Sequence, residues 1–263
     1  QMGQSTKGQN KSSVAWQMIE VGNSFYRLHD YQLAENAYRI AAQYFNKTAD
    51  RQGQITSINN IGLCMLNLNK PEAALPLFRK TLTFSRQIND VPRIYSSNIY
   101  IGISLKELKR YDEAIAVLNG VSHFELDEKN LDLEDFRKLQ LGETYILSGD
   151  TIKGINTYLL LTGEVTEQSD IYYKSIALGR LGRFYYETGD IQQSLKFATE
   201  GYELLKDRLD DAPAHGIVVA ASTAAVTLWL CLIASASLNG TLASVMVVTA
   251  IALAICTWRD WPV

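Results

Sequence analysis

The residues of this chain whose types could carry catalysis or bind a metal ion are its histidines and cysteines. They are His29, His123 and His215, together with Cys64, Cys231 and Cys256. The histidines stand far apart in unrelated contexts, and no pair of these residues has the close spacing of a zinc or redox site. The sequence also lacks HExxH, GxSxG, CxxC and phosphate-loop motifs. It therefore predicts neither an enzyme nor a protein that holds a metal or a cofactor.

Composition separates the chain into two parts. The protein has 263 residues, of which 47% are hydrophobic and 20% are charged, and its net charge is −3. A chain of this length and composition can bury a core, whereas binding to a phosphate backbone needs clustered Lys and Arg. We therefore expect a folded protein that does not bind nucleic acid. Residues 215–258, however, contain no Lys, Arg, Asp or Glu and need their own interpretation.

Glycines recur along the polar part at a constant interval of forty residues. They are Gly22, Gly62, Gly102, Gly142 and Gly182. A second register, twelve residues later, holds a small residue in every copy: Ala34, Ala74, Ala114, Gly154 and Ser194. Since a glycine inside a helix costs about 1 kcal/mol against alanine, five glycines at one spacing indicate a packing requirement. Two registers with one period predict five structural repeats.

Each copy carries two helical patterns separated by a short polar break. In the second copy Ile58, Ile61, Met65 and Leu68 recur at intervals of three and four, the period of an amphipathic helix. The breaks contain Gly, Asn, Asp or Pro, which end one helix and begin the next. Two antiparallel helices approach closely only where one presents a small side chain. We therefore expect the repeat glycines to admit large side chains from the second helix of each pair.

Gly22, Phe25, Ala34, Tyr38 and Ala41 resemble the pattern of the tetratricopeptide repeat (TPR) family, and the resemblance extends from residue 15 to about residue 205. The second and third copies keep part of the pattern, which degrades in the fourth and fifth. The interval of forty exceeds the usual interval of about thirty-four and indicates a long-repeat branch of the family. The resemblance implies a right-handed superhelix whose first helices line a concave groove for a peptide or a partner helix.

The positions that the family register assigns to this groove hold residues of mixed charge. They are Asn23, Tyr26, Arg27, Asn60, Lys106, Glu143, Arg183 and Tyr186. The presence of positive, negative and neutral polar side chains indicates a polar and specific contact surface for a protein or peptide. Some family members capture a C-terminal carboxylate with Lys and Asn, and the resemblance places Asn23 and Asn60 at two of these positions. The remaining positions hold Ile19, Ser96 and Tyr100, which are not cations, so carboxylate capture is not expected.

Residues 216–238 and 241–258 each form an apolar run long enough to be a membrane-spanning helix. Asn239 and Gly240 between them are typical of a tight turn, and two tryptophans near the C-terminus stand where an interfacial aromatic belt would lie. The sequence thus predicts a helical hairpin that contacts the lipid bilayer and packs against a larger membrane complex or serves as an anchor. A hairpin buried in a protein core is the alternative.

Together these interpretations predict an all-α protein, a right-handed superhelix of five helix-turn-helix repeats followed by two transmembrane helices. Its expected divisions are an N-terminal tail (1–13), the repeat array (14–209), a linker (210–215), the transmembrane hairpin (216–258) and a C-terminal tail (259–263). The predicted function is a membrane-anchored scaffold or assembly subunit for protein–protein interaction. The alternatives are a sensor module of a bacterial TPR signalling protein of the histidine kinase type, without its output domain here, and an assembly factor of a secretion or respiratory complex.

The apolar tail also predicts a location in a membrane, and we expect a bacterial inner membrane. Lys206 and Arg208 precede the first predicted span and Arg259 follows the second, which favours a cytoplasmic repeat array. Gln1 in place of methionine favours a periplasmic array instead, since removal of a signal peptide leaves such a start.

Overall fold

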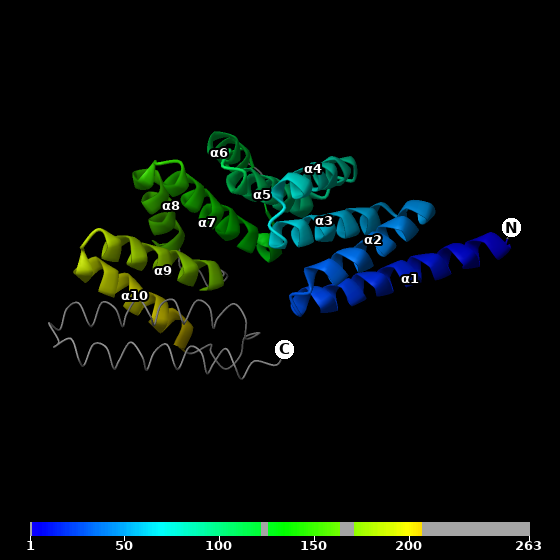
Figure 1. The fold of residues 1–263 in the computed structure, drawn as a ribbon, viewed down its shortest axis with the longest axis horizontal. Helices are drawn as coiled ribbons and strands as arrows, with labels where there is room; N and C mark the ends of the chain where they lie inside the picture. Colours follow the sequence, from blue (N-terminus) through cyan, green and yellow to red (C-terminus); the bar gives the residue numbers. More distant parts are fainter. Residues whose placement is uncertain (1, 122–125, 164–170, 207–263) are drawn as a thin grey trace. The chain divides into compact units, whose positions relative to one another are not determined.

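The computed structural model describes residues 2–121, 126–163 and 171–206, and the regular structure in this part of the chain is helical (Figure 1). Its elements are α1 (Met2–Arg27), α2 (Tyr31–Thr48), α3 (Arg51–Asn67), α4 (Pro71–Gln87), α5 (Val91–Glu107), α6 (Tyr111–Asn119), the 3-10 helix η1 (Glu128–Asn130), α7 (Asp132–Leu147), α8 (Thr151–Gly163), α9 (Ile171–Glu187) and α10 (Ile191–Lys206). The prediction of an all-α repeat architecture is confirmed.

The chain divides into two compact units, residues 1–150 and 151–263. Helices α1 to α7 belong to the first unit and α8 to α10 to the second, so the predicted fourth repeat has its two helices in different units. Helix α1 begins at Met2, within the stretch 1–13 that the sequence assigned to a tail. The handedness of the predicted superhelix stays a prediction.

Helix ends in the first unit recur every twenty residues. A left-handed backbone conformation follows successive helices at His29, Ala49, Asn69, Asn89 and Lys109. It turns the next amide back toward the carbonyl group five residues earlier, as where the N–H of Asp30 donates to the carbonyl oxygen of Phe25 at 3.0 Å. The same bond recurs at the later turns, for example from Lys70 to Met65 at 2.9 Å. Helices of similar length joined by one kind of turn produce the interval of forty.

Aspartate begins several of these helices. Asp30, Asp50 and Asp90 immediately precede α2, α3 and α5, and each carboxylate accepts a hydrogen bond from a backbone N–H three residues on, at 3.1, 2.9 and 3.2 Å. Such a cap satisfies a backbone donor that has no partner inside the helix. Helix α4 begins instead with Pro71, whose missing N–H costs nothing at this position. The polar breaks in the sequence are therefore the caps and turns of the fold.

Three repeat glycines lie directly against a buried side chain of the following helix. The pairs are Gly22 with Tyr38, Gly62 with Phe78 and Gly102 with Leu118. A Cβ atom on Gly22 would lie 2.4 Å from Cε1 of Tyr38, far inside the optimal carbon–carbon separation of about 3.5–4.0 Å. The absence of a side chain on one helix is thus what lets the two helices of each pair approach.

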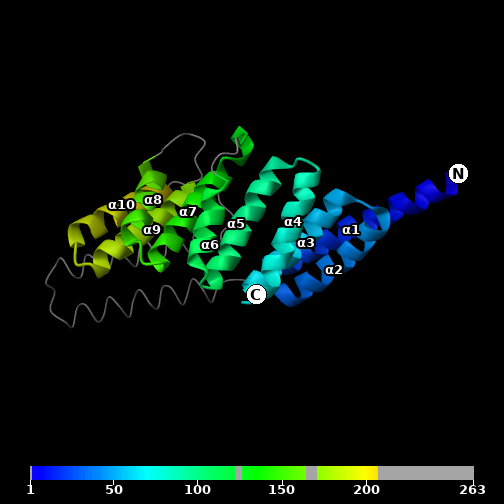
Figure 2. The same ribbon diagram turned by 90° about the horizontal axis from the view of Figure 1, so that it is seen from above.

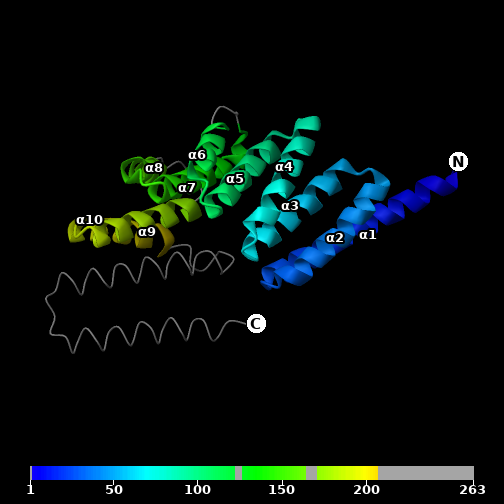
Figure 3. The same ribbon diagram turned by 45° about the horizontal axis from the view of Figure 1, so that its top comes forward.

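Within the first unit, helices that follow one another in the chain pack together, and α1 also contacts α3 while α5 also contacts α7. Figures 2 and 3 show α1 to α5 following one another in chain order. The contacts between odd-numbered helices place them along one face of the unit, as expected when a stack of helix pairs buries its core between neighbours.

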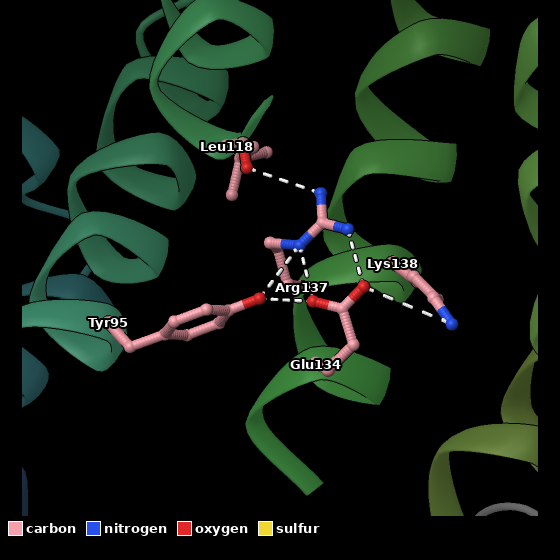
Figure 4. A network of polar contacts seen from close by, with 5 residues as sticks. All are labelled: Tyr95, Leu118, Glu134, Arg137 and Lys138. Carbon is pink, nitrogen blue, oxygen red and sulfur yellow. Dashed lines mark hydrogen bonds and ion pairs between the residues drawn. The ribbon is translucent and has the colours of Figure 1, made fainter. Parts of the chain in front are cut away.

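Helix α6 has only nine residues, about half the length of its neighbours, and Arg137 of α7 binds its end (Figure 4). The Nη1 atom of Arg137 donates to the carbonyl oxygen of Leu118 at 3.2 Å, and Nε donates to the hydroxyl of Tyr95 at 3.0 Å. Glu134 accepts from Nε and Nη2 of Arg137 at 2.7 and 2.6 Å and also from the Tyr95 hydroxyl. Helices α5, α6 and α7 are therefore joined by one polar network.

The surroundings of this network shift the pKa values of its members. Burial raises the pKa of Tyr95 above its ordinary value, and the hydrogen bond to Glu134 raises it further. Burial also opposes the charge of Glu134, but the hydrogen bonds from Arg137 and Tyr95 outweigh it and lower the pKa of Glu134. Both members of the ion pair are consequently charged at neutral pH, which is the condition for a buried pair to be stable.

In the second unit, α9 packs against α8 and α10. Tyr185 of α9 stacks on Phe197 of α10 with ring centroids 5.4 Å apart. Ser194 occupies the small-residue register of the fifth copy, and its hydroxyl donates to the carbonyl oxygen of Gly182 at 2.8 Å. The close approach of the two helices is retained here with a short polar side chain in place of alanine.

The predicted membrane location is wrong for the described part of the chain, because none of its helices is long and apolar enough to cross a bilayer. Helices such as α2 and α4 carry charged residues along one side, as amphipathic helices do at a protein surface. The runs 216–238 and 241–258, on which the prediction depended, lie outside the described residues. We therefore withdraw the location in a bacterial inner membrane.

Candidate functional site

We give the name odd-helix face to a set of side chains on α1, α3, α5 and α7, whose members are in contact between α1 and α3 and between α5 and α7. Its members are Asn23, Tyr26, Asn60, Leu63, Asn67, Tyr100, Ile103, Lys106, Phe136, Gln140 and Glu143. The amide of Asn67 donates to the hydroxyl of Tyr26 at 2.8 Å and joins α3 to α1. Tyr100 of α5 meets Phe136 of α7 edge to face, with ring centroids 6.0 Å apart. Most of these side chains are half-buried.

The predicted contact residues of α1 are engaged in the fold to different degrees. Tyr26 is half-buried, and burial raises its pKa to about 12 despite the hydrogen bond from Asn67. The side-chain oxygen of Asn23 accepts a hydrogen bond from the buried Tyr38 hydroxyl at 2.8 Å, so this amide is oriented by the core. Arg27 is exposed, with one long bond of 3.4 Å to the hydroxyl of Ser24.

Lys106 and Glu143, both predicted contact residues, bind each other. Their Nζ and Oε2 atoms lie 2.7 Å apart, and Nζ also donates to Gln140 at 3.1 Å. The side chain of Lys106 is only 8% exposed. The structure thus brings two predicted residues together and, in doing so, neutralises the charge that each would offer to a partner.

The other predicted residues are distributed over both units. Asn60 of α3 is half-buried and shares a stripe with Leu63 and Asn67 at helical spacing. Arg183 and Tyr186 lie on α9 in the second unit. Arg183 is 77% exposed and forms an ion pair with Glu187, one turn along its own helix, at 2.8 Å. Their part in partner binding stays a prediction.

Tyr100 was named from the sequence only as a position without a cation, and the aromatic centre that it forms with Phe136 was not predicted. Tyr100 lies between two rings, stacked on Phe78 at 5.1 Å on one side and facing Phe136 on the other. A signal for it was present, because Tyr100 and Gln140 follow Asn60 at the interval of forty. Extending the register of each predicted residue through every repeat would have found these positions.

The residues considered first for chemistry do not form a reactive centre in the described ranges. No group of three or more His, Cys, Asp or Glu side chains there could hold a metal ion. Cys64 is fully buried, and burial raises the pKa of its thiol to about 12. The ring of His29 lies 2.7 Å from the hydroxyl of Tyr31 at an exposed turn. His123 and His215 lie outside the described residues.

No protein-family model matches the sequence, and no curated protein matches it either. Solved structures, in contrast, resemble the fold of this chain. The nearly identical TPR-like repeats of a protein described as a kinesin light chain from Podosopora anserina match with a TM-score of 0.58 and 11% identity, over 75% of this chain and 98% of that one. The chain has a TPR-type fold.

Two further solved structures also match this fold. The apo form of the quorum sensor NprR from B. thuringiensis matches with a TM-score of 0.63 and 14% identity, over 98% of this chain and 70% of that one. A thermophilic TPR protein of Thermus thermophilus matches with a TM-score of 0.51 and 15% identity, over 80% of this chain and 98% of that one. At these identities the likeness shows the fold alone, so the function has to be argued from the site.

Proposed function

We propose that the protein is a non-enzymatic scaffold for protein–protein interaction and that the odd-helix face of the first unit binds an extended peptide segment of its partner. The observation that carries this proposal is a set of aromatic and amide side chains, most of them half-buried, that are in contact between α1 and α3 and between α5 and α7. A face of this kind is supported by a rigid stack of helices and leaves its side chains open to a ligand.

The chemistry of the face indicates what kind of peptide it binds. Asn60 and Gln140 offer both donors and acceptors, which suit the backbone N–H and C=O groups of an extended segment. Tyr100, Ile103 and Phe136 offer apolar surface, and aromatic side chains are frequent anchors of binding energy. Each of these five side chains is half-buried. An apolar side chain of the partner would therefore lie against the aromatic centre while its backbone meets the amides.

The charges on the odd-helix face further restrict the kind of peptide that it can bind. The only cation among the residues of the odd-helix face is Lys106, and Glu143 already neutralises it at 2.7 Å. A free carboxylate would gain no ion pair there and would lose its water. We therefore expect an internal, uncharged segment as the ligand, and not a C-terminal carboxylate.

The test is to select ten-residue peptides from a random display library on the immobilised full-length chain, and then to measure their affinities by fluorescence anisotropy. Asn60→Arg places a long cation on the odd-helix face and should weaken binding of the selected apolar peptides at least tenfold. Asn36→Arg is the matched control, because Asn36 is exposed on α2 and lies outside this face. Its binding should stay within about twofold of wild type, by the small effect expected away from a contact.

Two outcomes contradict the proposal. One is a set of selected peptides that binds Asn60→Arg as tightly as wild type. The other is equal weakening by both arginine variants, which would indicate a general effect of added charge. Circular dichroism of each variant shows whether a loss of binding is only a loss of fold.

A further inference from the structure

A second surface of the first unit carries cations without counter-charges. Lys106, Arg39 and Arg137 are each held by a carboxylate within 2.7 Å. In contrast, Arg51 at the start of α3 and Lys80 on α4 form no ion pair within the described residues. Both side chains are exposed. A cation without a partner is common at a protein surface, but these two are held at one place by an aromatic ring.

Phe84 of α4 is that ring. The Cζ atom of Arg51 lies 4.2 Å from the centroid of Phe84, and Nζ of Lys80 lies 5.6 Å from it. Both distances are within the range of a cation–π contact, about 6 Å. The two cations are therefore within about 10 Å of each other by these distances. Lys47 lies four residues before Arg51, at the end of α2, and its Nζ is 5.9 Å from the ring of Tyr44.

The carboxylate nearest in sequence serves as a helix cap. Asp50 precedes Arg51 directly, but its side chain accepts a hydrogen bond from the N–H of Gly53 at 2.9 Å and caps α3. Nη1 of Arg51 donates to the neutral side chain of Gln54 at 2.9 Å. Arg51 also stands at the first position of a helix, where the helix dipole disfavours a cation. An anion near Arg51 and Lys80 would offset the repulsion between the two cations and the repulsion of Arg51 by the helix dipole.

We propose that Arg51, Lys80 and Phe84, here named the cation–aromatic patch, form a docking surface for an acidic peptide segment of a partner protein. Alternate side chains of an extended segment are about 7 Å apart, which falls within the upper limit of about 10 Å on the separation of the two cations. The guanidinium of Arg51 can bind one carboxylate with two parallel hydrogen bonds, while Lys80 takes the next. The ring of Phe84 holds both cations in place.

A peptide fits this surface better than a nucleic acid does. A phosphate backbone presents a long array of charges and requires many basic contacts, whereas this patch has two cations. A short acidic segment, with two carboxylates, therefore matches this patch better than a long polyanion does. The proposal does not depend on the odd-helix face, because the two surfaces share no residue.

The test uses the full-length chain and two fluorescein-labelled peptides, five repeats of Glu-Ser and five repeats of Gln-Ser. The double variant Arg51→Glu with Lys80→Glu should weaken anisotropy-detected binding of the Glu-Ser peptide at least tenfold. The matched control, Arg86→Glu with Lys109→Glu, makes the same change in net charge at two exposed cations outside the patch. It should weaken binding less than threefold, and the Gln-Ser peptide should not bind wild type.

Phe84→Leu is a second variant that leaves every charge in place. It should weaken binding of the Glu-Ser peptide severalfold, because the cations are no longer held by a ring, and circular dichroism confirms that each variant is folded. Equal weakening by the two double variants would overturn the proposal, as would binding of the Gln-Ser peptide. Tighter binding of oligouridylate or of anionic lipid vesicles through Arg51 and Lys80 would overturn the assignment to a peptide.

Discussion

The packing of the repeat glycines can be tested by adding one methyl group. In Gly22→Ala, the new Cβ would lie 2.4, 2.6 and 2.9 Å from Cε1, Cδ1 and Cζ of Tyr38. The ring cannot move easily, because it is 2% exposed and its hydroxyl donates to Asn23 at 2.8 Å. Overpacking of this kind costs up to about 3 kcal/mol. Alanine returns about 1 kcal/mol of helix propensity, which leaves a net loss of about 2 kcal/mol.

Gly179→Ala is the matched control. Gly179 lies inside α9, and a Cβ atom there would meet nothing within 4 Å. The gain in helix propensity is common to both substitutions, so Gly179→Ala should stabilise its unit by up to about 1 kcal/mol. The difference between the two variants, about 3 kcal/mol, then measures the overpacking cost alone.

The assay is urea denaturation followed by circular dichroism at 222 nm, which reports the loss of helix. Because the two units can unfold separately, each variant is compared with wild type for the transition of its own unit. A Gly22→Ala protein as stable as wild type would refute the argument that glycine is required for close approach. Adding Tyr38→Leu should make Gly22→Ala less damaging than it is alone, because the two changes share one contact.

The remaining predictions concern polar groups in the first unit. Arg137→Met should cost up to about 3 kcal/mol in urea denaturation, since the half-buried carboxylate of Glu134 loses its closest cation and keeps, among the described residues, only Lys138 at 3.9 Å. Arg110→Met, at a fully exposed pair, should cost much less. Similar losses would show that burial of the pair is unimportant. The pKa of Glu134 is lowered in the folded state, so the stabilisation from its charge is present above the pKa of the unfolded state and is lost as pH falls through the pKa of the folded state. Wild type should therefore lose more stability than Arg137→Met in an acid titration. Parallel curves of stability against pH would contradict this. The hydroxyl of Ser85 is buried and has no hydrogen-bond partner among the residues that the structure describes, so Ser85→Ala should leave stability unchanged or raise it by up to about 1 kcal/mol. Ser57→Ala removes a bond of 2.8 Å to a backbone carbonyl and should not be stabilising.

The helices and their order could be predicted from the sequence because the signals are local and periodic. Gly22 and Tyr38 are sixteen residues apart, within one helix pair, and their spacing returns in the next copies. Turn residues such as Asp30 act through backbone atoms only three residues away. Contacts between residues this close in sequence can be read from a short window of the sequence, and their repetition makes them easy to recognise.

The candidate site was predicted less well because its contacts join distant parts of the chain. Lys106 and Glu143 each have the register of a contact residue, but only the packing of α5 against α7 shows that they neutralise each other. Arg51 and Phe84 give no sequence signal of their contact, which depends on how α3 lies against α4. Side-chain partners of this kind follow from the approach of two surfaces and not from the period of either helix.

The sequence by itself determined that the polar part of this protein is a stack of helix pairs with an interval of forty residues. It did so because small side chains and turn residues at regular positions restrict the backbone locally. The tertiary structure alone decided which polar groups remain open to a partner. Arg137 is buried against Glu134 and Leu118, whereas Arg51 stays exposed on Phe84. Their sequence neighbourhoods do not distinguish these two arginines, because burial is a property of the packed surfaces around a residue.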